Sequence, residues 1–182
     1  MKKLLQVLAT HFIIIIMITT SSERTFSQSW NTFDISFSGC SAIFPHEPAW
    51  EISYAEDSSR IWLGEAMESD IFFGVICVEF AAPLVNESTK DDLVLMAENY
   101  LTYLQTEFNI VAHSGYSISY VVEINENACQ ITDEWEDAEE DSWLINVWID
   151  PYNMTVMYMY SGPENNMNDY SDMFFNSFTF PD

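Results

Sequence analysis

Short runs in which apolar and polar residues alternate dominate this chain, and alternation with a period of two is typical of β-strands. The pattern predicts strands at 32–38, 41–44, 60–65, 71–80, 109–113, 117–124, 128–132, 142–149 and 154–160, with a last short strand at 178–180. The run 71–80 is apolar at both parities, which predicts a strand that is covered on both faces. The turn sequence at 150–153 joins its two neighbouring strands into a β-hairpin.

Helical spacing appears twice. Between 89 and 108, apolar residues recur at the i, i+3, i+4 and i+7 positions of one buried stripe, and Ser88 with Asp91 fits a capping box at its start. A shorter helix is expected at 163–176. Strands, one long helix, more strands and a closing helix together indicate an α+β fold, a mostly antiparallel sheet with helices packed on it.

The first 27 residues have the three parts of a cleavable secretory signal. Lys2 and Lys3 form a positive start, 4–18 is apolar, and a segment of small and polar residues ends at Ser27. The apolar stretch is shorter than the roughly 20 residues that a helix needs to span a bilayer. No cysteine lies near the cleavage region, which argues against a lipoprotein. We therefore expect a signal peptide at 1–27, one domain at 28–182, and a secreted or periplasmic protein.

The chain is strongly acidic, with 29 acidic residues, five basic ones and a net charge of −24. Cleavage after Ser27 would leave only Arg60 and Lys90 as basic residues. Such a surface repels phosphate backbones and anionic membranes, so neither is an expected partner. A basic protein partner or divalent cations are compatible with the charge, as is simple solubility outside the cell. Disorder is excluded, because the chain is 48% hydrophobic and 15% aromatic.

The three cysteines are an odd set for an oxidising compartment. Cys77 lies in an apolar run and is expected to be a buried hydrophobic residue. If one disulfide forms, the pair to test first is Cys40 with Cys129. No spacing of cysteine and histidine indicates a zinc site.

Two short stretches resemble the PsbP-like superfamily. The segment 37–48 (FSGCSAIFPHEP) is similar to the Phe-Pro-x-x-Pro segment near the start of its bacterial members, and 174–180 (FFNSFTF) is similar to their closing pattern. The order of the elements between them agrees as well. The resemblance implies an α/β/α sandwich around a mostly antiparallel sheet, with a binding or accessory role and no catalytic residues.

Candidate catalytic residues are few. Only His46 and His113 remain after the signal to act as a base, and neither lies in the sequence context of an activated nucleophile. Glycine-rich loops that cradle phosphate are absent from the sequence. Paired carboxylates are so abundant that they neither indicate nor exclude a hydrolase.

The segment 133–141 stands out because it is almost entirely acidic, and we expect it to lie between two strands. Its carboxylates suit a calcium ion, which prefers oxygen ligands, and Trp135 suits an aromatic anchor for a basic partner. An ordinary solvated loop explains the composition equally well. The candidate metal ligands are Asp133, Glu134, Glu136, Asp137, Glu139, Glu140 and Asp141.

The sequence therefore favours an exported, non-enzymatic α+β domain that serves in binding or as an accessory protein and needs no cofactor. The alternatives are a calcium-dependent surface or adhesion module and a small hydrolase that works through carboxylates.

Overall fold

The computed structural model describes residues 30–36, 38–84, 88–123 and 125–181. The expected signal peptide at 1–27 lies outside these residues. Among the described residues, no helix combines the length and the apolar character that crossing a membrane requires. The strands and helices are β1 (Asn31–Asp34), β2 (Ser41–Phe44), β3 (Ala49–Tyr54), β4 (Arg60–Glu68), β5 (Ile71–Glu79), α1 (Lys90–Glu107), β6 (Ile110–His113), β7 (Ser117–Ser119), β8 (Cys129–Asp137), β9 (Ser142–Ile149), β10 (Asn153–Ser161) and α2 (Asn168–Phe175).

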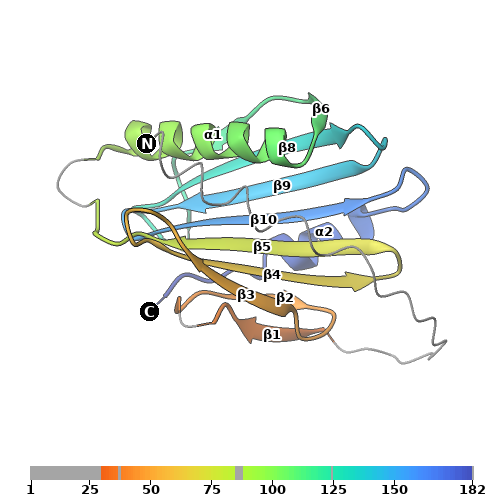
Figure 1. The fold of residues 1–182 in the computed structure, drawn as a ribbon, viewed down its shortest axis with the longest axis horizontal. Helices are drawn as coiled ribbons and strands as arrows, with labels where there is room; N and C mark the ends of the chain where they lie inside the picture. The colour runs from red at the N-terminus through yellow and green to blue at the C-terminus, as the bar shows by residue number, and fades with distance from the viewer. Residues whose placement is uncertain (1–29, 37, 85–87, 124, 182) are drawn as a thin grey trace.

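An eight-stranded sheet forms the middle layer, in the order β3-β4-β5-β10-β9-β8-β6, with β7 also paired to β8. Every pairing between these strands is antiparallel. Strands β1 and β2 form a separate antiparallel hairpin beside β3. Figure 1 shows α1 running along the β8 side of the sheet and α2 behind β10 and β5.

The two faces of the sheet carry two separate hydrophobic cores. Leu93, Ala97, Leu101 and Leu104 of α1 pack with the residues of one face. Phe174 of α2 packs with residues of the other face and with the β1–β2 hairpin. The expected α+β class and the α/β/α arrangement are confirmed. The strand 71–80 was expected to be covered on both faces, and β5 is buried at nearly every position.

Gly74 of β5 leaves room for the side chain of Tyr158 on the neighbouring strand β10. Gly74 pairs with Tyr158 of β10, and the phenol ring of Tyr158 lies directly over the Gly74 backbone. Tyr158 is only 1% exposed. Any Cβ at position 74 would overlap that ring, so the two residues are matched in size.

The long helix begins one residue later than its sequence pattern suggested. Thr89, and not Ser88, is the N-cap residue, and it accepts a hydrogen bond from the backbone N–H of Asp92. The Asp92 carboxylate in turn accepts from the backbone N–H of Thr89 at 2.8 Å, which completes the capping box. This bond is charge-assisted, and it lowers the pKa of Asp92 together with the bond from the Thr89 hydroxyl.

Several elements differ from the sequence expectations, among them the strand expected at 117–124, which ends at Ser119. The first strand ends at Asp34, because the backbone turns at Ser36 with a positive φ of 50°. Strand β3 was not predicted from the sequence, and it begins directly after Pro48, where a proline costs no sheet hydrogen bond. The closing helix is shorter than 163–176. The end of the chain makes a single bridge from Thr179 to Ser41, and no full strand.

We predict that Gly74→Ala lowers the free energy of unfolding by about 2 kcal/mol, because the new methyl group overpacks against Tyr158. Urea denaturation followed by tryptophan fluorescence measures this change. Gly162→Ala is the matched control, since the nearest side-chain atom to a Cβ there is an Asp141 oxygen at 3.8 Å. Equal stability losses in the two variants would contradict the proposed overlap.

Candidate binding surface

The acidic segment 133–141 is largely a strand. Strand β8 continues to Asp137, and only 138–141 forms the turn to β9. The expectation that the whole segment separates two strands is therefore wrong. The expectation failed because 133–137 is a strand only through its pairing with β9, and the acidic composition gives no sign of that pairing. Alternation along β8 turns Asp133, Trp135 and Asp137 inward and leaves the side chains between them exposed.

Asp133 is 4% exposed and serves as a hydrogen-bond hub. Its Oδ1 accepts from the Ser114 hydroxyl at 2.9 Å and from the backbone N–H of Gly115 at 3.0 Å. Its Oδ2 accepts from the indole N–H of Trp135 at 2.7 Å and lies 3.3 Å from Nδ1 of His113. A buried carboxylate is stable only with such partners, and this one attaches the loop after β6 to β8.

Asp137 is a second hydrogen-bond hub, which holds the turn at 138–141. It is 8% exposed, and its Oδ1 accepts from the backbone N–H groups of Glu139 and Asp141 at 2.9 and 3.0 Å. Its Oδ2 accepts from the indole N–H of Trp143 at 2.9 Å. Two of the candidate metal ligands are thus engaged in holding two tryptophans and a turn.

The structure revises both roles suggested for this segment. Trp135 is 3% exposed with its N–H already bonded, so it belongs to the core and presents no docking anchor. No three His, Cys, Asp or Glu side chains within the described ranges are grouped so that they could hold a metal ion. Glu134 and Glu136 point away from Asp133 and Asp137, which divides the segment's carboxylates between two faces of the sheet.

What remains accessible is an acidic end of the sheet. The register places the turns β4–β5 and β8–β9, the end of β10 and the end of α1 together (right side of Figure 1). We call the exposed and half-buried acidic residues of this region the acidic end. They are Glu68, Asp70, Glu107, Glu139, Glu140, Asp141 and Glu164.

Two features increase the negative potential there. Helix α1 directs its C-terminus to the acidic end and has no basic residue in its last turn, so its dipole adds to the carboxylates. Burial, followed by the charges of Asp137 and Glu139, raises the pKa of Asp141. Such mutual repulsion is relieved when a positive charge binds.

The positive charges of the described residues lie at the opposite end of the molecule. Arg60 is paired with Glu79 at 2.6 Å and lies over the ring of Trp62. Lys90 begins α1 and donates to the carbonyl of Tyr120. Both positions adjoin the first residues of β8 and β10, a full strand length away from the turn at 138–141. The basic residues therefore lie at one end of the strands, where carboxylates such as Glu79, Asp91 and Asp92 accompany them, whereas the acidic end has carboxylates alone among its charged residues.

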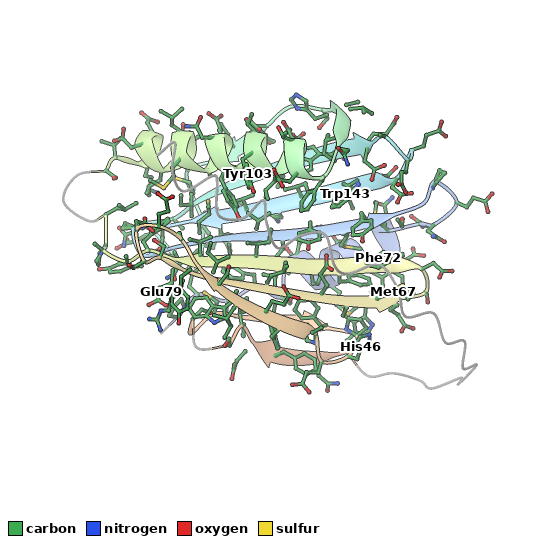
Figure 2. The ribbon with its side chains drawn as sticks, viewed as in Figure 1. His46, Met67, Phe72, Glu79, Tyr103 and Trp143 are labelled. Carbon is green, nitrogen blue, oxygen red and sulfur yellow. The ribbon has the colours of Figure 1, made fainter. Side chains whose placement is uncertain are left out.

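A second polar site was missed in the sequence because it depends on strand pairing. Glu65 of β4 accepts a hydrogen bond from the Tyr158 hydroxyl at 2.6 Å, across the gap left by Gly74. Burial raises the pKa of Glu65, the tyrosine bond opposes that change, and the charge of Glu51 adds to it. Next to this pair, Tyr160 stacks between Phe72 and Trp143, at ring distances of 4.5 and 4.1 Å (Phe72 and Trp143 are labelled in Figure 2).

The structure does not bring together Cys40 and Cys129, the pair suggested by the sequence if one disulfide forms. Both side chains are buried. They lie in different hydrophobic cores, Cys40 on the α2 face of the sheet and Cys129 on the α1 face. The sheet itself separates them, and cysteine spacing in the sequence carries no information about which face a residue occupies.

No family model matches the chain, and the comparison with curated proteins finds no match. Among solved structures, the chain is similar to the solution structure of cyanobacterial PsbP (CyanoP) from Synechocystis sp. PCC 6803. Sequence identity is 14%, the TM-score is 0.45, and the match covers 88% of this chain and 98% of that one. This is the family that 37–48 and 174–180 resemble in sequence. A likeness of this extent carries no argument about the residues or the role of this chain.

We predict that Asp133→Ala lowers the free energy of unfolding by about 3 kcal/mol, because it leaves several buried donors without an acceptor. Glu134→Ala, one residue away but exposed, is expected to change it by less than about 0.5 kcal/mol. Thermal and urea unfolding of both variants gives the comparison. Similar effects of the two substitutions would show that Asp133 is no hub.

We also predict that Glu65 makes the fold more stable in acid. Its pKa is raised in the folded state, so its contribution is complete below the ordinary value of 4.5 and is lost as the pH rises through the raised one. Glu65→Gln keeps an oxygen for Tyr158 and has no charge to bury. Its melting temperature is therefore expected to equal that of the wild type near pH 4 and to exceed it above neutrality. Glu56→Gln, in an exposed turn, is the control, and parallel pH profiles for Glu65→Gln and this control would refute the prediction.

Proposed function

We propose that this chain is an exported, non-enzymatic binding protein whose acidic end receives a basic partner protein. The observation that carries the proposal is the acidic end itself, which holds no basic residue of the described chain. One end gathers seven carboxylates and a helix C-terminus, and both basic residues of the described chain lie at the other. Complementary potential of this kind steers a partner and orients it on the surface.

The export part of the proposal depends on the sequence. Residues 1–27 have the composition of a cleavable signal, and their removal takes away Lys2, Lys3 and Arg24. The working chain is then more acidic than the full sequence. A secreted or periplasmic location is the expected consequence.

The non-enzymatic part is supported by the surroundings of the two described histidines. Both ring nitrogens of His46 face backbone carbonyls, those of Glu47 and Met67, at 3.2 and 3.1 Å (His46 and Met67 in Figure 2). His113 contacts Asp133, as a catalytic base would contact its orienting carboxylate. However, the Ser114 hydroxyl donates to that same carboxylate and not to the histidine, so no activated serine results.

The test is a pull-down from the exterior fraction of the source cells with purified mature protein as bait. The binding variant replaces Glu107, Glu139, Glu140 and Glu164 of the acidic end with Gln, and leaves the two structural aspartates intact. We expect it to recover about tenfold less of the basic partner, since complementary charges carry the interaction. High salt is expected to weaken recovery by the wild type in the same direction.

The matched control removes the same charge elsewhere, with Gln at Glu51, Glu56, Glu123 and Glu126, which are all exposed. It is expected to bind as the wild type does. Equal recovery by all three proteins would end the proposal that the acidic end is the docking surface. Equal losses of partner recovery in the two variants would show that net charge determines binding and that the acidic end has no special role.

A further inference from the structure

Two of the three cysteines meet in the core on the α2 face. Cys40 and Cys77 are both 0% exposed and belong to the same hydrophobic cluster. Their side chains are in direct contact, as a hydrogen bond between the two thiols. Cys129 lies in the cluster on the other face and contacts the carbonyl of Lys90 at 3.8 Å.

The local structure holds each thiol in place. Cys40 follows Gly39, whose φ of +80° turns the chain between β1 and β2. Its backbone N–H donates to the Ser38 hydroxyl at 3.1 Å. Cys77 lies in the middle of β5, opposite Thr155 of β10, and the Thr155 hydroxyl donates to its sulfur at 3.4 Å.

The contact distinguishes the two thiols chemically. The hydrogen bond from Cys40 lowers the pKa of Cys77, and the same contact together with burial raises the pKa of Cys40. Thiolate is the form that attacks a disulfide. Because both thiols are buried once this core has closed, either one can be the attacking thiolate before closure.

We propose that Cys40 and Cys77 form an intramolecular disulfide in the exported protein, with Cys129 left as a free thiol. The oxidant is a thiol–disulfide oxidoreductase in its disulfide form. One of the two cysteines, as a thiolate, attacks one sulfur of that disulfide and releases the other sulfur as a thiolate. The second cysteine, after losing its proton, then attacks the sulfur of the first cysteine in the mixed disulfide. The chain loses two protons and two electrons in total, and the oxidant becomes a dithiol.

The bond would link two parts of the fold that are otherwise joined only by packing and a few hydrogen bonds. The β1–β2 hairpin forms its own two-stranded sheet and contacts the rest through the α2 side. A disulfide from its turn to β5 would attach it covalently to one of the central strands. Because both sulfurs are fully buried, oxidation has to occur before this core closes. The proposal rests on the export part of the proposed function, since such bonds form and persist in oxidising compartments.

The test is thiol counting on the full chain expressed with residues 1–27 and recovered from the exterior. The protein is denatured in iodoacetamide without reductant, and its intact mass is measured. We expect one alkylated cysteine per chain before reduction and three after it. Digestion at acidic residues, without reduction, is expected to yield one linked peptide that joins Cys40 to Cys77.

Three variants sharpen the result. Cys129→Ser is expected to keep the linked peptide and to show no alkylation before reduction. Cys40→Ser and Cys77→Ser are each expected to show two alkylated cysteines and a melting temperature that reductant does not change. In the wild type, reduction is expected to lower the melting temperature by roughly 10 °C.

A second arm distinguishes the pairing from the export. The reduced mature chain is refolded in a glutathione buffer and analysed in the same way. A linked peptide after refolding but not from cells would support the pairing and contradict export to an oxidising space. Three alkylated cysteines in both arms, or a linked peptide that contains Cys129, would overturn the disulfide.

Discussion

The burial of β5 and β10 on both faces is the constraint on which the rest of this structure depends. These two strands lie in the middle of the eight-stranded sheet, with a helix packed on either face. Every side chain along them must fit a closed space, because protein cores are packed as densely as organic crystals. Gly74 exists as a space for Tyr158, and the Tyr158 hydroxyl then requires the acceptor that Glu65 provides. On the opposite face of the sheet, β5 places Cys77 in contact with Cys40.

Acidic residues perform two distinct tasks in this protein. Asp133 and Asp137 are buried and accept hydrogen bonds from two indole groups and several backbone amides, so their charge is used to hold loops and turns. The glutamates beside them remain in solvent and contribute potential. This division follows from strand geometry, since neighbouring residues in a strand point to opposite faces. The acidic residues of β8 therefore fall into two groups, a buried structural group and an exposed surface group.

The placement of both described basic residues at one end gives the molecule an orientation that net charge does not describe. The antiparallel register brings four separate chain segments to the acidic end, and both described basic residues to the other. A basic partner would approach the acidic end of the sheet and would be attracted less strongly near Arg60 and Lys90. The proposed disulfide would act elsewhere, on the hairpin at the β3 edge, and is independent of that surface.

The sequence by itself determined the α+β class, the long helix, the hairpin at 142–160 and the two-sided burial of 71–80, because these follow from periodicity and turn chemistry within a few residues. It also determined the charge and the candidate export signal. The sequence did not show how far β8 extends, because its acidic second half, 133–137, forms a strand only by pairing with β9. The roles of Trp135, Glu65 and the cysteines were likewise decided by tertiary structure. Which face a side chain occupies, and which distant residue it meets, depends on register and on the layer above it, and those are long-range properties of the folded chain.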